Sequence, residues 1–197
     1  MLDSKQYWVD RYANGNDSGS GSDGVLGDYK ASFINSLIHM LSLKSIVDHG
    51  CGDGKLLNLL DLEGVEYRGY DVSIDAISKI EGFHVSTYDD YIPRRFDLAL
   101  SMDVLFHLIE DEVFNSYMSM LFNDGEFVLI YGYDSEDDPM LKHGRRSLPH
   151  MKYRSFSKWI SENTSHYLSG IFDNPYTYDH NTRTGSICSF YLYHNVV

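Results

Sequence analysis

The sequence predicts an α/β fold in one domain, built on a mostly parallel sheet, and three observations support this prediction. Apolar runs suited to buried strands alternate with helix-like segments along most of the chain. Gly50, Gly52 and Gly54 follow one such run and precede a leucine-rich segment, which is typical of a strand–turn–helix unit. A length of 197 residues suits one domain with a substantial core.

The first 28 residues divide into a short helix-like segment and a glycine–serine stretch. Tyr7, Trp8, Arg11 and Tyr12 fall on one side of the predicted helix. The glycine–serine stretch at 13–24 has two interpretations that stay open here. It is either a flexible leader or part of a lid over a ligand, with glycines as a hinge or as backbone donors to a carboxylate. In a lid, Arg11 would pair with a carboxylate of the ligand.

The next segments predict a helix packed on the first strands of the sheet. Apolar residues recur at helical spacing over 29–43. Lys30 in this helix is expected to be exposed; the alternative is a second partner for a ligand carboxylate. Buried strands, a short leucine-rich helix and a second helix capped by Ser73 follow, with strands at 46–47, 65–70 and 83–86 and helices at 56–60 and 74–80.

The second half of the chain continues the alternation and ends in a hairpin. Strands are expected at 96–102, 127–131, 167–172 and 187–193, helices at 110–121 and 156–160, and a turn at 123–125. The irregular segment at 133–154 carries acidic residues first and basic residues later, and we expect it to cover a substrate. Its basic side chains either recognise an anionic or sugar-like acceptor or, as we favour, form a solvated loop; they are His143, Arg145, Arg146, His150 and Arg154.

Composition excludes several classes of protein. The net charge of −13, from 29 acidic and 16 basic residues, weighs against binding along a nucleic-acid backbone. Two cysteines, Cys51 and Cys188, do not make a disulfide framework, so a reducing cytoplasm is expected. The start of the chain lacks an apolar signal core, and no run is long enough to span a membrane. The nine histidines are scattered without metal-ligand spacing, so no metal site is expected.

The glycine turn at 48–54 carries acidic residues, and these decide which ligand it suits. Asp48 and Asp53 would repel the pyrophosphate of a dinucleotide, and the spacing G-x-G-x-G differs from the dinucleotide pattern G-x-G-x-x-G. An acidic turn instead suits a ligand with positive charge. The string D-H-G-C-G-D-G resembles motif I of the class I S-adenosylmethionine-dependent methyltransferases. The resemblance implies that S-adenosylmethionine, a sulfonium and ammonium compound without phosphate, is the cofactor.

Acidic residues after the next strands fit the same cofactor. Asp71 ends the second predicted strand about 20 residues past the glycine turn, where a carboxylate accepts hydrogen bonds from ribose hydroxyls. We favour this role over helix capping, which Ser73 supplies. After the third strand, Asp89 and Asp90 compete to accept the adenine amino group, and plain solvation is an equal alternative.

The resemblance extends over nearly the whole chain. The order of elements resembles the three-layer, Rossmann-like methyltransferase fold, with a seven-stranded, mostly parallel sheet whose last strand is antiparallel. The chain also resembles a narrower group of bacterial methyltransferases with undefined substrates, which share W-x-x-R-Y, S-G-x-G-S with a following lysine, G-x-D-V-S and S-x-D-V-x-x-H-L-x-E-D-E-V-F. This chain matches these patterns at 8–12, 18–22 with Lys30, 69–73 and 101–114. The predicted cofactor-binding residues are Tyr7, Arg11, Asp48, Gly50, Cys51, Gly52, Gly54, Asp71, Val72, Asp89, Ser101 and Met102.

Two residues after the fourth strand are the catalytic candidates. His107 is the candidate general base, because histidine suits proton transfer at neutral pH. Asp103 is expected to position the substrate or the cofactor ammonium. Packing or capping is an equal alternative for each. The function expected is methyl transfer to oxygen or nitrogen of a small polar acceptor, a sugar or metabolite. The alternatives are an RNA or protein methyltransferase, or a cofactor-binding protein without catalysis; the oligomeric state is left open.

Overall fold

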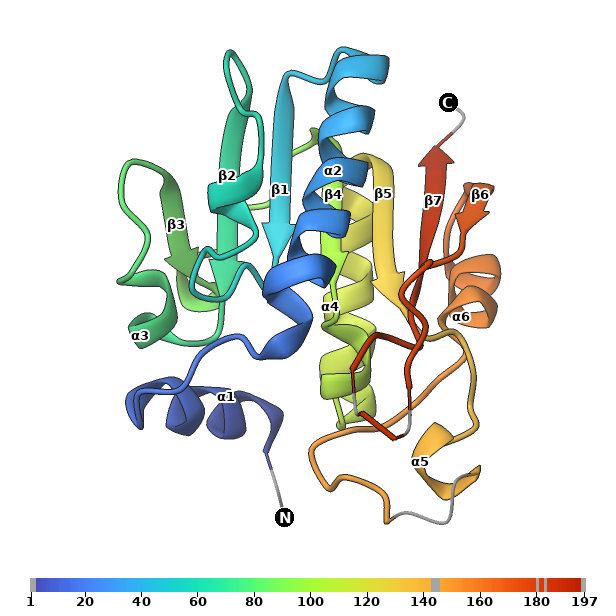
Figure 1. Cartoon of the computed structure of the whole chain (residues 1–197). Coiled ribbons are helices and arrows are strands. Elements are labelled where there is room, and N and C mark those ends of the chain that lie inside the picture. The colour runs from blue at the N-terminus through green and yellow to red at the C-terminus, as the bar shows by residue number, and fades with distance from the viewer. Residues whose placement is uncertain (1–2, 143–145, 180, 183, 196–197) are drawn as a thin grey trace.

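Seven strands form one sheet with the order β3-β2-β1-β4-β5-β7-β6 (Figure 1). The computed structural model describes residues 3–142, 146–179, 181–182 and 184–195. The strands are β1 Ser45–His49, β2 Glu66–Asp71, β3 His84–Thr87, β4 Phe96–Met102, β5 Gly125–Gly132, β6 His166–Phe172 and β7 Ser189–Asn195. Strands β1 to β5 are parallel, and β7 runs antiparallel to both β5 and β6. The predicted mostly parallel sheet with an antiparallel last strand is confirmed.

Helices cover both faces of the sheet and give the fold three layers. Helix α2 (Gly24–Leu41) lies on one face, and α4 (Asp111–Asp124) and α6 (Phe156–Asn163) lie on the other (Figure 1). Successive strand residues point to opposite faces. Ile46 therefore packs in the core beside α2, whereas Val47 packs in the core beside α4 and α6. The central strands are apolar on both faces, as expected for a buried parallel sheet.

The remaining elements gather near the carboxyl ends of the parallel strands. Helix α1 crosses below the carboxyl ends of β1 and β2 (Figure 1). The short elements are α1 Ser4–Ala13, η1 Ser20–Ser22, η2 Leu57–Leu59, α3 Ile74–Ile77, η3 Tyr88–Asp90, η4 Leu105–His107 and α5 Pro139–Lys142. Ligands of open α/β sheets bind at the carboxyl ends of the strands, so a ligand site is expected there.

The turn predicted at 123–125 is wrong, because α4 continues to Asp124 and β5 begins at Gly125. Tertiary contacts explain the difference. The buried Asp124 carboxylate accepts a hydrogen bond from Tyr91 Oη at 2.8 Å, and its other oxygen lies 3.2 Å from His49 Nε2. These contacts hold Asp124 inside the fold as the last residue of α4. The predicted helices at 56–60 and 74–80 are also shorter, as η2 and α3.

No helix in the described part of the chain is both long enough and apolar enough to cross a membrane. Within the same ranges, no group of three or more histidine, cysteine, aspartate or glutamate side chains is arranged to hold a metal ion.

Candidate functional site

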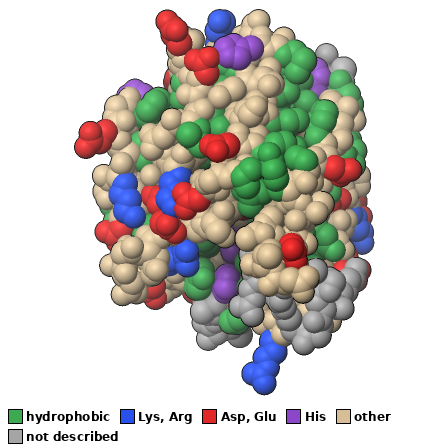
Figure 2. Space-filling view, in the orientation of Figure 1, with side chains coloured by type: hydrophobic (Ala, Val, Ile, Leu, Met, Phe, Trp, Pro, Cys, Tyr) green, Lys and Arg blue, Asp and Glu red, His purple; other side chains and the backbone are tan. Residues whose placement is uncertain are grey.

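A cavity of about 840 Å³ opens at the carboxyl ends of β1, β2 and β4. Its volume falls within the range of sites for small molecules and cofactors. Helix α1, the glycine turn, η4 and the segments at 148–153 and 185–188 contribute its walls. In the described part of the face shown in Figure 2, histidine side chains are visible in a recess in the lower half. Segments far apart in the sequence thus converge on one space.

The glycine turn brings bare backbone to the cavity. Gly50 and Gly52 have φ angles of +83° and +58°, a region that glycine adopts without strain. A Cβ atom on Gly50 would lie 2.5 Å from Val104 Cγ2, and one on Gly52 would overlap Ser18 Oγ. Gly54 contacts Ile80 and does not line the cavity. The first two glycines therefore form the cavity wall, and Gly54 supports the packing behind it.

Asp71 lies at the end of β2 with its carboxylate against the glycine turn. Its Oδ2 accepts a hydrogen bond from Gly52 N at 3.0 Å, and its Oδ1 accepts one from Ser73 N at 2.9 Å. Burial raises the pKa of this carboxyl, and the backbone donors oppose the rise. Each carboxylate oxygen has a further lone pair. Asp71 lines the cavity together with Val72, so it can accept hydrogen bonds from a ligand's hydroxyls.

Asp48, at the end of β1, is a buried carboxyl beside the glycine turn. Tyr67 Oη donates a hydrogen bond to its Oδ2 at 3.0 Å. Burial raises the pKa of Asp48 to about 7, and the nearby Asp71 carboxylate adds to the rise. A cation in the cavity would favour the ionised form. The ligand-free turn is thus prepared for positive charge.

We predict that Asp48→Asn stabilises the ligand-free protein above pH 7. Because folding raises the pKa of Asp48 to about 7, the native state binds this proton more tightly than the unfolded state. The free energy of unfolding should therefore fall as pH rises from about 4 to 7 and stay low above pH 7. The variant should lose this fall, which amounts to roughly 3 kcal/mol. Urea unfolding of both proteins from pH 4 to 8 measures it; parallel pH profiles would contradict the prediction.

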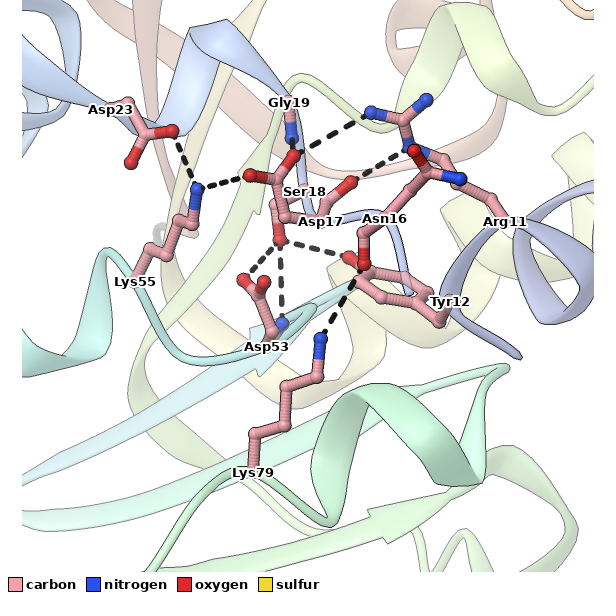
Figure 3. A network of polar contacts seen from close by, with 10 residues as sticks. All are labelled: Arg11, Tyr12, Asn16, Asp17, Ser18, Gly19, Asp23, Asp53, Lys55 and Lys79. Carbon is pink, nitrogen blue, oxygen red and sulfur yellow. Dashed lines mark hydrogen bonds and ion pairs between the residues drawn. The ribbon is translucent and has the colours of Figure 1, made fainter. Parts of the chain in front are cut away.

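The N-terminal segment at residues 3–23, which we call the lid after its predicted role, is fastened to the residues around the glycine turn by polar contacts (Figure 3). Ser18 Oγ donates to Asp53 Oδ1 at 2.5 Å and lies 2.8 Å from Tyr12 Oη. Lys55 Nζ pairs with Asp17 at 2.7 Å and with Asp23 at 2.5 Å. Both contacts join the lid to the residues that follow Gly52. The segment is therefore held to the glycine turn, and its role as a lid over a ligand stays a prediction.

Arg11 also fastens the lid while lining the cavity. Its Nε donates to the backbone oxygen of Asp17 at 2.7 Å (Figure 3). The guanidinium also lies over the Trp8 ring, 5.6 Å from its centre. The pairing of Arg11 with a ligand carboxylate stays a prediction.

We predict that Lys55→Met loosens the lid. The variant loses both ion pairs to the lid, which are partly exposed and hence individually weak. Amide hydrogen exchange at residues 17–23 should accelerate a few-fold, as mass spectrometry measures. The matched control is Lys158→Met, since Lys158 is exposed on α6, outside the cavity walls. Equal exchange in the two variants would show that these pairs do not hold the lid.

The expectation that Lys30 is exposed is wrong. Its side chain is 1% exposed, and Nζ donates to Asp103 Oδ2 at 2.6 Å. The ammonium also lies 5.1 Å from the centre of the Tyr131 ring. A buried lysine needs such partners, and only the folded chain brings Asp103 to it across 73 positions.

Asp103 lines the cavity in a backbone conformation unusual for its type. Its φ angle is +60°, a region that residues other than glycine seldom adopt. The side chain is 23% exposed and pairs with Lys30. Gly21 of the lid packs so close that a Cβ there would lie 3.0 Å from Asp103 Oδ2. Asp103 is thus fixed at the meeting point of the lid, β4 and α2, and its role toward a ligand stays a prediction.

His107 lines the cavity from η4, and its environment sets its protonation. Burial lowers the pKa of His107 to about 4, so the ring is neutral at pH 7. Nδ1 lies 3.4 Å from the backbone oxygen of His150. A carbonyl only accepts, so a hydrogen bond there places the proton on Nδ1 and leaves Nε2 as an acceptor. His107 is accordingly a hydrogen-bond acceptor and a weak base.

The other predicted residues divide between the cavity and its surroundings. Tyr7, Cys51 and Met102 line the cavity. Burial raises the pKa of the Cys51 thiol well above its usual value, so it packs as a protonated thiol. Ser101 is buried with Oγ 2.8 Å from Tyr117 Oη and does not line the cavity. Asp89 is exposed on η3, pairs with Lys5 at 3.4 Å and lies outside the cavity walls.

In the described part of the basic segment at 142–154, Lys152 and Arg154 contact the start of α4 and the residues before it. Arg154 donates to the backbone oxygens of Leu108 and Ile109, and both Arg154 and Lys152 pair with Asp111. Arg146 is exposed. His143 and Arg145 lie outside the described residues. The favoured interpretation as a solvated loop is thus wrong for Arg154, which braces the start of α4.

Sequence reasoning missed Tyr88, a cavity residue next to the predicted Asp89. Its hydroxyl is buried without a hydrogen-bond partner among the described residues, and burial raises its pKa well above the usual value. An unpaired buried hydroxyl is costly, so it is suited to a ligand that supplies a partner. The sequence signal for Tyr88 is its place directly after the third strand, next to the predicted Asp89 and Asp90.

Comparisons with known proteins agree with this geometry. A family model described as "Methyltransferase domain" matches residues 27–174. No curated protein matches the chain.

Solved structures share the fold at low sequence identity. Magnesium protoporphyrin IX methyltransferase (ChlM) from Synechocystis PCC 6803, with bound SAH, has a TM-score of 0.67 and 16% identity, covering 98% of this chain and 100% of that one. The CcbJ methyltransferase from Streptomyces caelestis has a TM-score of 0.66 and 14% identity, covering 100% of both chains. An S-adenosylmethionine-dependent methyltransferase from Clostridium acetobutylicum ATCC 824 has a TM-score of 0.65 and 14% identity, covering 95% and 99%.

Proposed function

The chain belongs to the class I S-adenosylmethionine-dependent methyltransferases, and from this premise we propose that it methylates an oxygen or nitrogen atom of a small polar acceptor, a sugar or another metabolite. The single observation that carries the residue assignment is the contact between Asp71 and the glycine turn. There, a buried carboxylate with spare lone pairs faces the cavity beside bare backbone.

The residues present fit the cofactor. Asp71 offers acceptors for two ribose hydroxyls, and the unpaired Tyr88 hydroxyl offers a donor toward the base. Asp48 supplies negative charge for the ammonium and sulfonium, and Arg11 supplies a guanidinium for the carboxylate. Among these cavity residues, carboxylates predominate at the glycine turn, which disfavours a pyrophosphate there.

The chain's contribution to the reaction is chiefly alignment and exclusion of water. S-adenosylmethionine supplies an activated methyl group when bound. The glycine turn and Asp71 fix the nucleoside, while the lid closes the cavity through Ser18 and Lys55. His107 Nε2 accepts a hydrogen bond from the acceptor's O–H or N–H group and orients its lone pair. Asp103, held by Lys30, positions the acceptor or the cofactor ammonium.

The described basic residues favour a small acceptor over RNA. Lys152 and Arg154 share one acidic partner, Asp111, and Arg154 also donates to the backbone oxygens of Leu108 and Ile109. On the described part of the face in Figure 2, lysine and arginine side chains lie among acidic ones and do not form a broad basic patch. A phosphate backbone needs such a patch.

The test is calorimetry with S-adenosylmethionine and S-adenosylhomocysteine, followed by transfer of labelled methyl groups to panels of metabolites, sugars, protein and RNA. Binding of both ligands and a labelled small-molecule product are expected. Lack of binding by the folded protein would overturn the proposal. Binding without a product from any panel would instead support a cofactor-binding protein without catalysis.

A further inference from the structure

Six aromatic side chains meet at the cavity, away from the glycine turn, and we call them the aromatic collar. They come from three segments that are far apart in the sequence: α1, η4 and the loop at 148–153. Each is half-buried and lines the cavity, and together they are Tyr7, Trp8, Phe106, His107, His150 and Tyr153.

The collar rings form flat walls. The rings of Tyr7 and His150 are stacked, with centroids 4.4 Å apart and planes 5° apart. The His107 ring lies 13° from the His150 plane at 5.7 Å, and the edge of Trp8 meets His107 at 4.8 Å. These separations are those of favourable aromatic pairs. A planar ring is the shape that extends such a set of walls.

The wall beside the collar is apolar and adaptable. Met140, Leu148 and Met151 also line the cavity, and Met151 Sδ lies 3.5 Å from Tyr153 Oη of the collar. Methionine side chains are flexible and make favourable contacts with aromatic rings. This lining favours an apolar ring system over a strongly hydrated molecule.

The charges around the cavity disfavour an anionic acceptor. Three cationic residues line it: Lys5, Arg11 and Lys55. Lys5 pairs with Asp89 and Lys55 with Asp17, and the proposed function assigns Arg11 to the cofactor carboxylate. Acidic lining residues outnumber them, and these are Asp3, Asp48, Asp71, Asp103, Glu110 and Glu112. A phosphate or carboxylate group on the acceptor would meet few free partners.

The polar atoms of the collar suit one or two polar groups on the acceptor. Tyr153 Oη is directed to Met151 Sδ at 3.5 Å, and His107 Nδ1 to the His150 carbonyl. His107 Nε2 and Tyr7 Oη have no hydrogen-bond partner among the described residues. A sugar carries hydroxyls around its whole ring, and each one buried without a partner costs roughly 1–3 kcal/mol. A sugar would therefore leave several hydroxyls unpaired here.

We propose that the acceptor is a planar aromatic molecule bearing a hydroxyl or amino group, held in the aromatic collar with that group at His107 Nε2. This narrows the proposed function and rests on it. In the reaction, the acceptor's oxygen or nitrogen lone pair forms the new bond to the methyl carbon as the carbon–sulfur bond breaks. The electron pair of that bond stays on sulfur. The acceptor's proton leaves through His107 Nε2 to solvent.

Tryptophan fluorescence offers a direct binding test, because the chain has two tryptophans. Trp8 is in the collar. Trp159 lies on α6, and its Nε1 donates a hydrogen bond to Asn115 Oδ1. In Trp159→Phe, Trp8 is the sole reporter. Titrations use catechol and 3-hydroxypyridine, with glucose and glucose 6-phosphate as matched non-aromatic probes, with and without S-adenosylhomocysteine. The aromatic probes should quench Trp8 saturably. In the matched control Trp8→Phe, where Trp159 on α6 is the sole reporter, they should cause no saturable quenching.

Turnover gives the second arm. Labelled methyl transfer by the unaltered protein is expected to catechol or 3-hydroxypyridine, and absent with the two sugars. In Phe106→Leu, the Kd or KM for the aromatic probe should rise at least fivefold, while the Kd for S-adenosylhomocysteine should change less than twofold.

The outcomes separate this proposal from the proposed function. Binding of S-adenosylhomocysteine together with methylation of a sugar, or with no saturable response to either aromatic probe, would overturn the aromatic acceptor and leave the methyltransferase assignment intact. Failure of the folded protein to bind S-adenosylhomocysteine would overturn the proposed function itself, even if catechol quenched Trp8.

Discussion

Gly52→Ala is expected to weaken cofactor binding at least 100-fold. An alanine Cβ at this position would overlap Ser18 Oγ and lie 2.9 Å from Tyr12 Oη. Both atoms belong to the network that fastens the lid to the glycine turn. The lid would have to move, and the backbone at a φ of +58° would be strained by about 1–2 kcal/mol. Calorimetry with S-adenosylhomocysteine should show at least a 100-fold loss of affinity.

Gly64→Ala is the matched control for this prediction. Gly64 has a φ of +72°, so alanine suffers the same kind of backbone strain, but a Cβ there meets nothing within 4 Å. In urea unfolding, backbone strain should lower the free energy of unfolding of both variants by a similar amount. Only Gly52→Ala should also lose cofactor affinity. If both kept that affinity, close approach at Gly52 would have no part in binding.

The second large effect is expected from Asp71→Asn. The amide keeps the size of the side chain but replaces one acceptor by a donor, which would then face Gly52 N–H or Ser73 N–H. The ribose would lose a charge-assisted partner as well. Together these losses amount to roughly 3 kcal/mol, or about 100-fold in Kd for S-adenosylmethionine.

Asp75→Asn is the control, because Asp75 is an exposed acid in the first turn of α3. It makes the same change of charge four residues away and should leave the affinity within twofold. Circular dichroism and thermal unfolding of each variant separate a loss of binding from a loss of fold. An Asp71→Asn protein that folds and binds as well as Asp75→Asn would remove the ribose role of Asp71.

The fold was predictable because its signals are local. Alternation of apolar strands and amphipathic helices predicted β4 with its observed bounds and placed both ends of every other strand within two residues. Motif I and Asp71 were predictable for a related reason: positive φ angles demand glycine, and a strand end places an acid at the sheet edge.

The collar and the lid contacts were not predictable from local pattern. Lys30 pairs with Asp103, which is 73 positions away in the sequence. Tyr7, near the start of the chain, stacks on His150 in its last third. The expectation for Lys30 failed because a lone lysine at the start of a helix is ordinarily solvated, and no neighbour in sequence announces its partner. Asp89 and Tyr88 show the same limit, because the direction of two adjacent side chains depends on the turn of η3.

The sequence by itself therefore determined the fold class, the family and the glycine turn to which we assign the cofactor, since each depends on residue types at short, fixed spacing. Tertiary structure alone decided which charges are neutralised, which histidine nitrogen is free and which rings face one another. Those properties depend on contacts between distant segments, which meet only when the sheet has formed and the N-terminal segment has packed on it. They set the chemistry of the acceptor side.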